Sequence, residues 1–207
     1  MSKVCEYFFA PHSPFAYLGH DRFVALAEKY QVQILPKPFD LSKIFGVSGG
    51  LPLAKRAPQR QAYRLKELAR WSEFLGKPMV LQPTYFPVNS DNAARLIIAT
   101  QLAHGTAASL RLTGAIMRAV WEEQRNIADH DTLVAIANAN EHDGAALLKS
   151  AETASVQAEF DRFTDEANAA SIFGAPWYVY DGEGYWGQDR LDFVERAFAK
   201  GSAASVQ

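Results

Sequence analysis

The stretch FFAPHSPFAYLGHDRF, residues 8–23, leads from the end of one predicted element straight into the next. The residues VCEYFFA (4–10) are β-branched and aromatic over the length of a strand, which ends before a proline. Ser13 suits an N-cap and Pro14 suits the first helical position. Apolar residues then recur at helical spacing to about Tyr30, so a strand followed by a helix is predicted.

A second strand is predicted at VQILPKPF (32–39), where we expect the two prolines to end it. Strand signals then almost vanish until about residue 170, and the intervening chain is predicted to be helical. Helices are expected at residues 58–76, 89–105, 108–124, 129–140 and 155–170. The end of the chain resumes with WYVY, an Asp-Gly turn, GYWG and an amphipathic helix over 188–201.

Composition limits the classes of function. The chain has 207 residues, 48% hydrophobic and 21% charged, with a net charge of −2, which suits one domain or one domain with an insertion. No segment resembles a membrane span or a signal peptide, so we expect no membrane partner and a cytoplasmic location. The near-neutral charge predicts no nucleic-acid partner. The single cysteine, Cys5, excludes an internal disulfide and is predicted to be a buried strand residue.

Four motifs carry a resemblance to a known family. They are SPFAYLG (13–19), FGVSGGLPLAKRAPQRQAYRL (45–65), PTYFPVN (83–89) and FGAPWYVYDGEGYWGQDRLDFVE (173–195). Together they closely resemble the 2-hydroxychromene-2-carboxylate isomerases, relatives of kappa-class glutathione transferases and DsbA-type oxidoreductases. The resemblance implies an α/β, thioredoxin-like fold with a large all-helical insertion.

That resemblance also implies a division of the chain. The thioredoxin-like domain would be discontinuous, formed by residues 1–40 and 171–201. Residues 41–170 would form the helical insertion domain, and residues 202–207 a frayed tail.

Ser13 is the candidate catalytic residue. The oxidoreductase relatives begin this helix with Cys-Pro-x-Cys, whereas residues 13–16 read Ser-Pro-Phe-Ala, so disulfide exchange is excluded. The resemblance implies that glutathione supplies the thiol as cofactor. A hydroxyl donor at a helix N-terminus favours the thiolate. Local sequence alone favours a simple N-cap for Ser13, and the resemblance to the family reverses this preference.

The resemblance nominates further glutathione-binding residues. Ala175 would bind the cysteinyl backbone, ahead of a cis Pro176 that leaves its backbone groups unpaired. Gln188 and Asp189 would hold the γ-glutamyl end, although capping the last helix also explains Asp189. Arg60 would neutralise a glutathione carboxylate, with Lys55 and Arg56 as weaker candidates. The kappa-class pattern has an asparagine where this chain has Gly50, which removes one contact.

The remaining candidates are weaker. Pro14, Phe15, Phe86 and Asn89 are expected to shape the substrate pocket, and Asn89 also suits a helix cap. His12 is expected in a pocket wall without an assigned role, and Arg190 in a surface or dimer ion pair. Tyr63, Trp71 and Tyr85 are expected in the core. No metal ligand set is predicted.

The resemblance implies conversion of 2-hydroxychromene-2-carboxylate to trans-o-hydroxybenzylidenepyruvate by a homodimer acting on a small aromatic-derived substrate. A thiolate would add to the conjugated carbon, the resulting single bond would rotate, and the sulfur would leave. The sequence identifies no general acid or base. A kappa-like transferase or peroxidase, and a non-catalytic glutathione-binding protein, remain alternatives.

Overall fold

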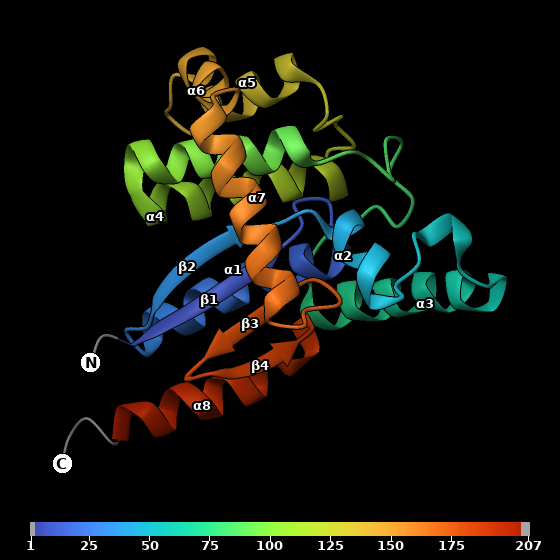
Figure 1. Ribbon diagram of the computed structural model, residues 1–207. Helices are drawn as coiled ribbons and strands as arrows, with labels where there is room; N and C mark the ends of the chain where they lie inside the picture. Colours follow the sequence, from blue (N-terminus) through green and yellow to red (C-terminus); the bar gives the residue numbers. More distant parts are fainter. Residues whose placement is uncertain (1–2, 204–207) are drawn as a thin grey trace.

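The computed structural model describes residues 3–203 and contains a four-stranded sheet with helices around it (Figure 1). The strands are β1 (Val4–Phe9), β2 (Gln33–Pro38), β3 (Trp177–Tyr180) and β4 (Glu183–Trp186), in the order β2-β1-β3-β4. β1 and β2 are parallel, whereas β3 is antiparallel to both of its neighbours. The predicted β-α-β start, C-terminal hairpin and thioredoxin-like fold are confirmed.

β2 contradicts one expectation, because it continues through both of its prolines to Pro38. It is an edge strand. Its first residue, Gln33, donates its N–H to the carbonyl of Lys3 just before β1, and Phe39, just after β2, donates to the carbonyl of Phe9 in β1. Pro36 and Pro38 occupy the alternate positions, where a backbone nitrogen faces the open edge. The missing N–H groups therefore cost the sheet no hydrogen bond.

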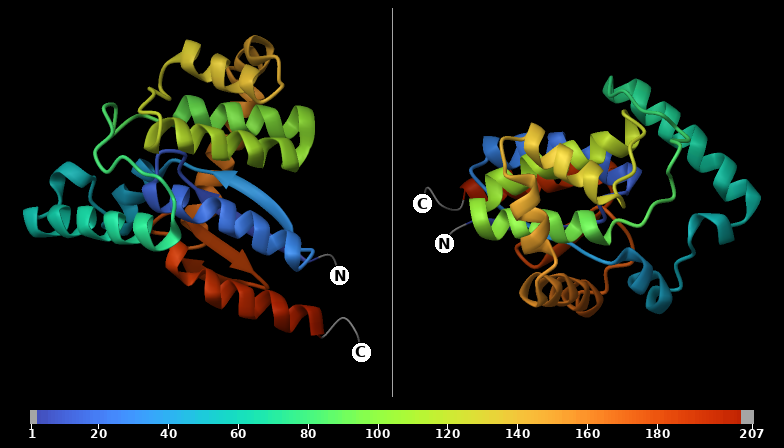
Figure 2. Two further views of the ribbon diagram at one scale, coloured as in Figure 1. Left: turned by 180° about the vertical axis from the view of Figure 1, so that it is seen from behind. Right: turned by 90° about the horizontal axis from the view of Figure 1, so that it is seen from above.

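Two helices complete the thioredoxin-like part, α1 (Pro14–Lys29) and α8 (Leu191–Ala203). They lie on the same side of the sheet, seen from behind in Figure 2. β1 alternates accordingly: Tyr7 stacks near Phe23 of α1, whereas Phe8 packs on the opposite face. The frayed tail expected at 202–207 is wrong for residues 202 and 203, which continue α8; the rest of it lies outside the described residues.

The chain between β2 and β3 is helical. Its elements are α2 (Leu41–Ser48), the 3-10 helix η1 (Leu53–Lys55), α3 (Pro58–Leu75), α4 (Asp91–Trp121), α5 (His130–Ala139), α6 (Gly144–Ala151) and α7 (Ala154–Ala169). The helices predicted at 89–105 and 108–124 are the two halves of α4, broken at Gly105 with φ 82°. α2 and α6 were not predicted, although Asp40 and Asp143 cap them.

The insertion packs tightly on the thioredoxin-like part. α4 contacts α1 and β2, and the imidazole of buried His20 on α1 is 3.0 Å from the carbonyl oxygen of Leu110 on α4. Trp71 of α3 is partly buried against this core. Tyr63 and Tyr85 were expected in the core, but they are 57% and 49% exposed, so that expectation is wrong. None of the described helices is both long and apolar enough to cross a bilayer.

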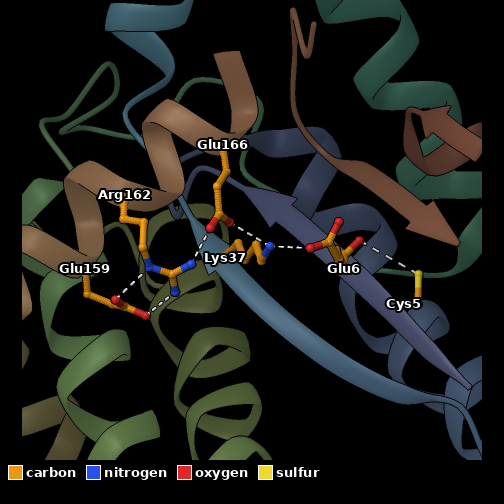
Figure 3. Close-up of polar contacts among 6 residues, drawn as sticks. All are labelled: Cys5, Glu6, Lys37, Glu159, Arg162 and Glu166. Atoms are coloured by element: carbon orange, nitrogen blue, oxygen red, sulfur yellow. Dashed lines mark hydrogen bonds and ion pairs between the residues drawn. The ribbon is translucent and has the colours of Figure 1, made fainter. Parts of the chain in front are cut away.

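A buried lysine joins the sheet to α7 (Figure 3). Lys37 of β2 is 8% exposed and contacts Glu6 of β1 and, at 2.7 Å, Glu166 of α7. Glu166 also binds Arg162 of α7, which in turn contacts Glu159. Lys37 thus neutralises two carboxylates from different elements.

We expect Lys37→Met to lower the free energy of unfolding by about 1–3 kcal/mol, because two partly buried carboxylates would lose their shared cation. Lys43→Met is the matched control, since its ion pair with Asp161 is largely exposed and contributes less than about 1 kcal/mol. Urea unfolding of both variants measures the difference. Equal losses in the two variants would contradict the prediction.

Candidate functional site

A cavity of about 790 Å³ lies where the N-terminus of α1, the loop before β3 and the insertion meet. The insertion contributes α2, the start of α3 and the loop that precedes α4. Eight of the residues nominated for glutathione or substrate line this cavity: Ser13, Pro14, Phe15, Arg56, Arg60, Phe86, Asn89 and Ala175. The tertiary structure therefore brings together candidates that are up to 162 positions apart in the chain.

Ser13 is both a helix cap and part of the cavity wall. Its hydroxyl oxygen accepts a hydrogen bond from the Ala16 N–H at 3.2 Å, which is the N-cap contact. The same hydroxyl donates to the carbonyl oxygen of Ala175 at 3.3 Å. Although Ser13 is only 5% exposed, it lines the cavity beside the positive end of the α1 dipole. The two roles proposed from the sequence are thus compatible in one side chain.

The bond between Ala175 and Pro176 is cis, as predicted. The carbonyl of Ala175 is not free as expected, because it accepts the hydrogen bond from Ser13. Within the described part of the chain, the Ala175 N–H makes no hydrogen bond. This cavity residue therefore presents one unsatisfied donor to a ligand.

Gln188 and Asp189 lie outside the cavity wall. They belong to the 3-10 helix η2 (Gln188–Arg190), which precedes α8. Asp189 was expected to cap the last helix, but it lies inside η2 and its carboxylate binds Arg190. Gln188 is 1% exposed and accepts a 2.9 Å hydrogen bond from Arg22 of α1. Asp189 pairs with the exposed Arg190, which confirms Arg190 as a surface ion-pair residue.

Three arginines form the cationic side of the cavity: Arg56, Arg60 and Arg64. Arg60 is exposed, whereas Arg56 donates a 2.8 Å hydrogen bond to the Leu51 carbonyl. Lys55, a weaker candidate, does not line the cavity. The cavity can therefore attract anionic ligands.

Arg64 was missed by the sequence analysis. It follows Arg60 by four residues on α3, a spacing that puts both on one helix face and was the available signal. Its guanidinium lies 5.0 Å from the ring centroid of Phe86 and 5.9 Å from that of Trp121. Burial, followed by the neighbouring charge of Arg56, lowers the pKa of Arg64 to about 10. It remains a cation at neutral pH.

His12 lies in the cavity wall, as predicted. Its Nδ1 shares a 2.7 Å hydrogen bond with the hydroxyl of Ser90, and its ring is 6.4 Å from that of Phe86. Burial lowers the pKa of His12 to about 4, with Arg64 acting in the same direction against the acidic side chains nearby. At neutral pH, His12 is therefore an uncharged imidazole next to Ser13.

Gly50 lies directly against the side chain of Phe45. A Cβ atom at this position would overlap that ring, so a larger residue here requires the ring to move. Phe45 itself lines the cavity in this region. Asn89 also lines the cavity, and its side-chain oxygen accepts a 2.9 Å hydrogen bond from the Asp91 N–H at the start of α4.

Cys5 is completely buried in β1, as predicted, and does not line the cavity. Burial, and then the carboxylate of Glu6, raise the pKa of the Cys5 thiol far above its usual range, which suppresses the thiolate. Among residues 3–203, no three His, Cys, Asp or Glu side chains cluster as metal ligands would. The cavity thus offers a hydroxyl, a backbone donor and cations, while any nucleophilic thiol must come from a ligand.

Curated proteins of similar sequence confirm the resemblance inferred from the four motifs. The 2-hydroxychromene-2-carboxylate isomerase of Pseudomonas putida is 28% identical over 200 residues, covering 95% of both chains. Its namesake from Sphingobium xenophagum is 26% identical over 94% of this chain and 97% of the relative. Glutathione s-transferase kappa 2 of Caenorhabditis elegans is 25% identical over 95% of this chain and 93% of the relative.

Solved structures support the same fold. A 2-hydroxychromene-2-carboxylate isomerase structure superposes with a TM-score of 0.83 at 24% identity, over 99% of each chain. The cytosolic disulfide reductase DsbM from Pseudomonas aeruginosa, solved with GSH, gives 0.70 at 16% identity over 97% of this chain and 99% of that one. The model of the DSBA-like thioredoxin domain matches residues 4–199, and the chain therefore belongs to this family.

Proposed function

We propose that this protein is a glutathione-dependent isomerase that converts 2-hydroxychromene-2-carboxylate to trans-o-hydroxybenzylidenepyruvate in aromatic-hydrocarbon catabolism. The observation that carries the proposal is the serine hydroxyl of Ser13 at the N-terminus of α1, inside a cavity whose own walls hold no cysteine. Relatives named as isomerases of this substrate align over nearly the whole chain.

Ser13 would act by stabilising the glutathione thiolate. The hydroxyl can turn from the Ala175 carbonyl to donate to the sulfur, while the α1 dipole adds a favourable positive potential. Both effects lower the pKa of a thiol from about 8.5 toward neutrality. More of the bound glutathione is then nucleophilic at pH 7.

The proposed chemistry needs no oxidant or reductant. The thiolate forms a C–S bond at the conjugated carbon, and the electron pair of the double bond moves to the carbonyl oxygen as an enolate. Rotation about the new single bond follows. The enolate then restores the double bond and expels the thiolate, so glutathione is regenerated. The proton transfers that open the chromene ring have no assigned acid or base.

Glutathione would be held mainly by a backbone N–H group and by a positively charged side chain. The free N–H of Ala175, with cis Pro176 behind it, suits pairing with the cysteinyl backbone, and Arg60 suits a carboxylate. The side chains of Gln188 and Asp189 bind Arg22 and Arg190 instead of lining the cavity. Their contact with the γ-glutamyl end of glutathione therefore stays a prediction.

The pocket for the substrate would be formed by Pro14, Phe15, Phe86 and Asn89, which line the same cavity. A kappa-like transferase or peroxidase remains the second candidate, since a kappa-class relative also aligns over the whole chain. A non-catalytic glutathione-binding protein is the third. We retain a cytoplasmic location as part of the proposal, because glutathione is abundant in reducing compartments.

Ser13→Ala should lower kcat/KM by about 10- to 100-fold, because a hydrogen bond to a charged sulfur is worth about 1.5–3 kcal/mol. Loss of the cap should lower the free energy of unfolding by only about 1 kcal/mol. Steady-state kinetics and urea unfolding of the same preparation separate the two effects. Wild-type turnover with reduced stability would make Ser13 a cap alone.

The matched control is Cys5→Ser, which removes the only sulfhydryl of the chain at a site remote from the cavity. Its turnover should equal that of the wild type. Loss of activity in a folded Cys5→Ser variant would overturn glutathione as the source of the nucleophile.

Glutathione should be recycled. With glutathione at about one hundredth of the substrate concentration, we expect full conversion of the substrate while the concentration of free glutathione stays constant. Mass spectrometry measures the substrate and the glutathione during the reaction. A reaction that stops when glutathione is consumed, with a stable adduct of matching mass, would establish the transferase. Binding of glutathione without turnover of any substrate in a panel would favour the non-enzymatic candidate.

We also expect a homodimer, a proposal that rests on the family and on exposed apolar residues of the insertion. Phe74 of α3 is 79% exposed, and Val47 of α2 is 68% exposed. Sedimentation velocity at micromolar concentration should give twice the mass of the chain. A single species with the mass of one chain would exclude the dimer at that concentration.

A further inference from the structure

Arg64 differs from its neighbours in the cavity wall because nothing compensates its charge. In the described part of the chain, its guanidinium makes no hydrogen bond and no ion pair. Its guanidinium lies near the rings of Phe86 and Trp121. Arg56, by contrast, is bound to the Leu51 carbonyl, and Arg60 is exposed to water. Arg64 is therefore the half-buried cation of this cavity with unused donors.

A half-buried guanidinium without a counter-charge is unfavourable, and an anion that enters the cavity relieves this cost. The guanidinium lies at cation–π distances from both rings, which favours this position of the side chain. A planar, bidentate partner such as a carboxylate matches its donors.

Two ligands could supply the carboxylate: glutathione, and the acceptor, which is the substrate to which the glutathione thiolate adds. The position of Arg64 indicates which of them it would bind. Phe86, which it contacts, is on the side of the cavity that also holds His12 and the loop before α4. The proposed glutathione contact at Ala175 lies in a different segment, the loop before β3, and Ser13 donates a hydrogen bond to its carbonyl. With the glutathione backbone at Ala175 and its sulfur beside Ser13, the part of the cavity lined by Phe86 and Arg64 is left for the acceptor.

We propose that Arg64 binds the carboxylate of the acceptor substrate and selects aromatic acceptors that carry an acid group over their neutral analogues. Phe86 would contact the aromatic ring of the acceptor and the guanidinium at the same time. The proposal rests on the proposed function, because it takes the cavity wall at Ala175 and Arg60 to bind glutathione. Arg64 is thus a residue that determines the specificity for acidic acceptors.

The test compares a charged ligand with its neutral analogue in two proteins. The probes are trans-o-hydroxybenzylidenepyruvate and its methyl ester, titrated by calorimetry into wild type and Arg64→Gln in saturating S-methylglutathione, whose blocked sulfur cannot react with either probe. We expect wild type to bind the acid about 10- to 100-fold more tightly than the ester, and Arg64→Gln to lose this preference. Arg64→Lys should keep part of it, because the charge remains without the planar fork.

Two further variants complete the design. Arg70→Gln, on the same helix but paired with Glu67 in an exposed position, should keep the full preference for the acid. Arg60→Gln should weaken glutathione instead, measured by a separate titration without the acceptor. Glutathione affinity should be unchanged within about twofold in Arg64→Gln.

An unchanged preference in folded Arg64→Gln would overturn the assignment, and so would absence of any preference in wild type. A loss of glutathione affinity in Arg64→Gln would overturn it as well, because Arg64 would then belong to the glutathione side. Failure of the proposed function has a different signature: the acid binds through Arg64, but no substrate in the panel is converted. Binding and turnover are thus judged separately.

Discussion

The hydrogen bond from Ser13 to the Ala175 carbonyl joins the two parts of the chain on which the site depends. It ties the N-terminus of α1 to the loop before β3, although 162 positions separate the two residues. The same hydroxyl caps α1, so the helix dipole, the cis Ala175–Pro176 bond and the cavity wall share one polar contact. The Cys-Pro-x-Cys motif of the oxidoreductases that this chain resembles in sequence would place a sulfur at this junction. In this chain, a hydroxyl that cannot exchange disulfides occupies it.

The insertion supplies what the thioredoxin-like part lacks, which is positive charge on the cavity wall. Arg56, Arg60 and Arg64 all come from the segment at the start of α3. They differ in solvation, because one is hydrogen-bonded, one is exposed and one lies between aromatic rings. Desolvation makes the last of these most responsive to an entering anion. Under the two proposals, one helix would bind the carboxylate of glutathione through Arg60 and that of the acceptor through Arg64.

Buried polar contacts fix the orientation of the insertion relative to the sheet. Lys37 links β1, β2 and α7 through two carboxylates, as Figure 3 shows, and His20 links α1 to α4. Such contacts are directional, so they select one orientation of the helices over others that would bury similar apolar area. The cationic side of the cavity depends on that orientation, because α3 contacts α1 directly and places Arg64 against Phe86.

The sequence by itself determined the order of the main elements, the loss of the cysteine pair and the family, because capping residues, apolar periodicity and local motifs act within a few residues. It predicted the hairpin and the two halves of α4 from local signatures, and the cis proline from the resemblance to the family. Only the tertiary structure decided that β2 continues through its prolines, which an edge position permits. It also decided that Tyr63 and Tyr85 are exposed, that Gln188 binds Arg22 instead of lining the cavity, and that Arg64 lacks a counter-charge. Burial and pairing depend on residues distant in the chain, and no local pattern encodes them.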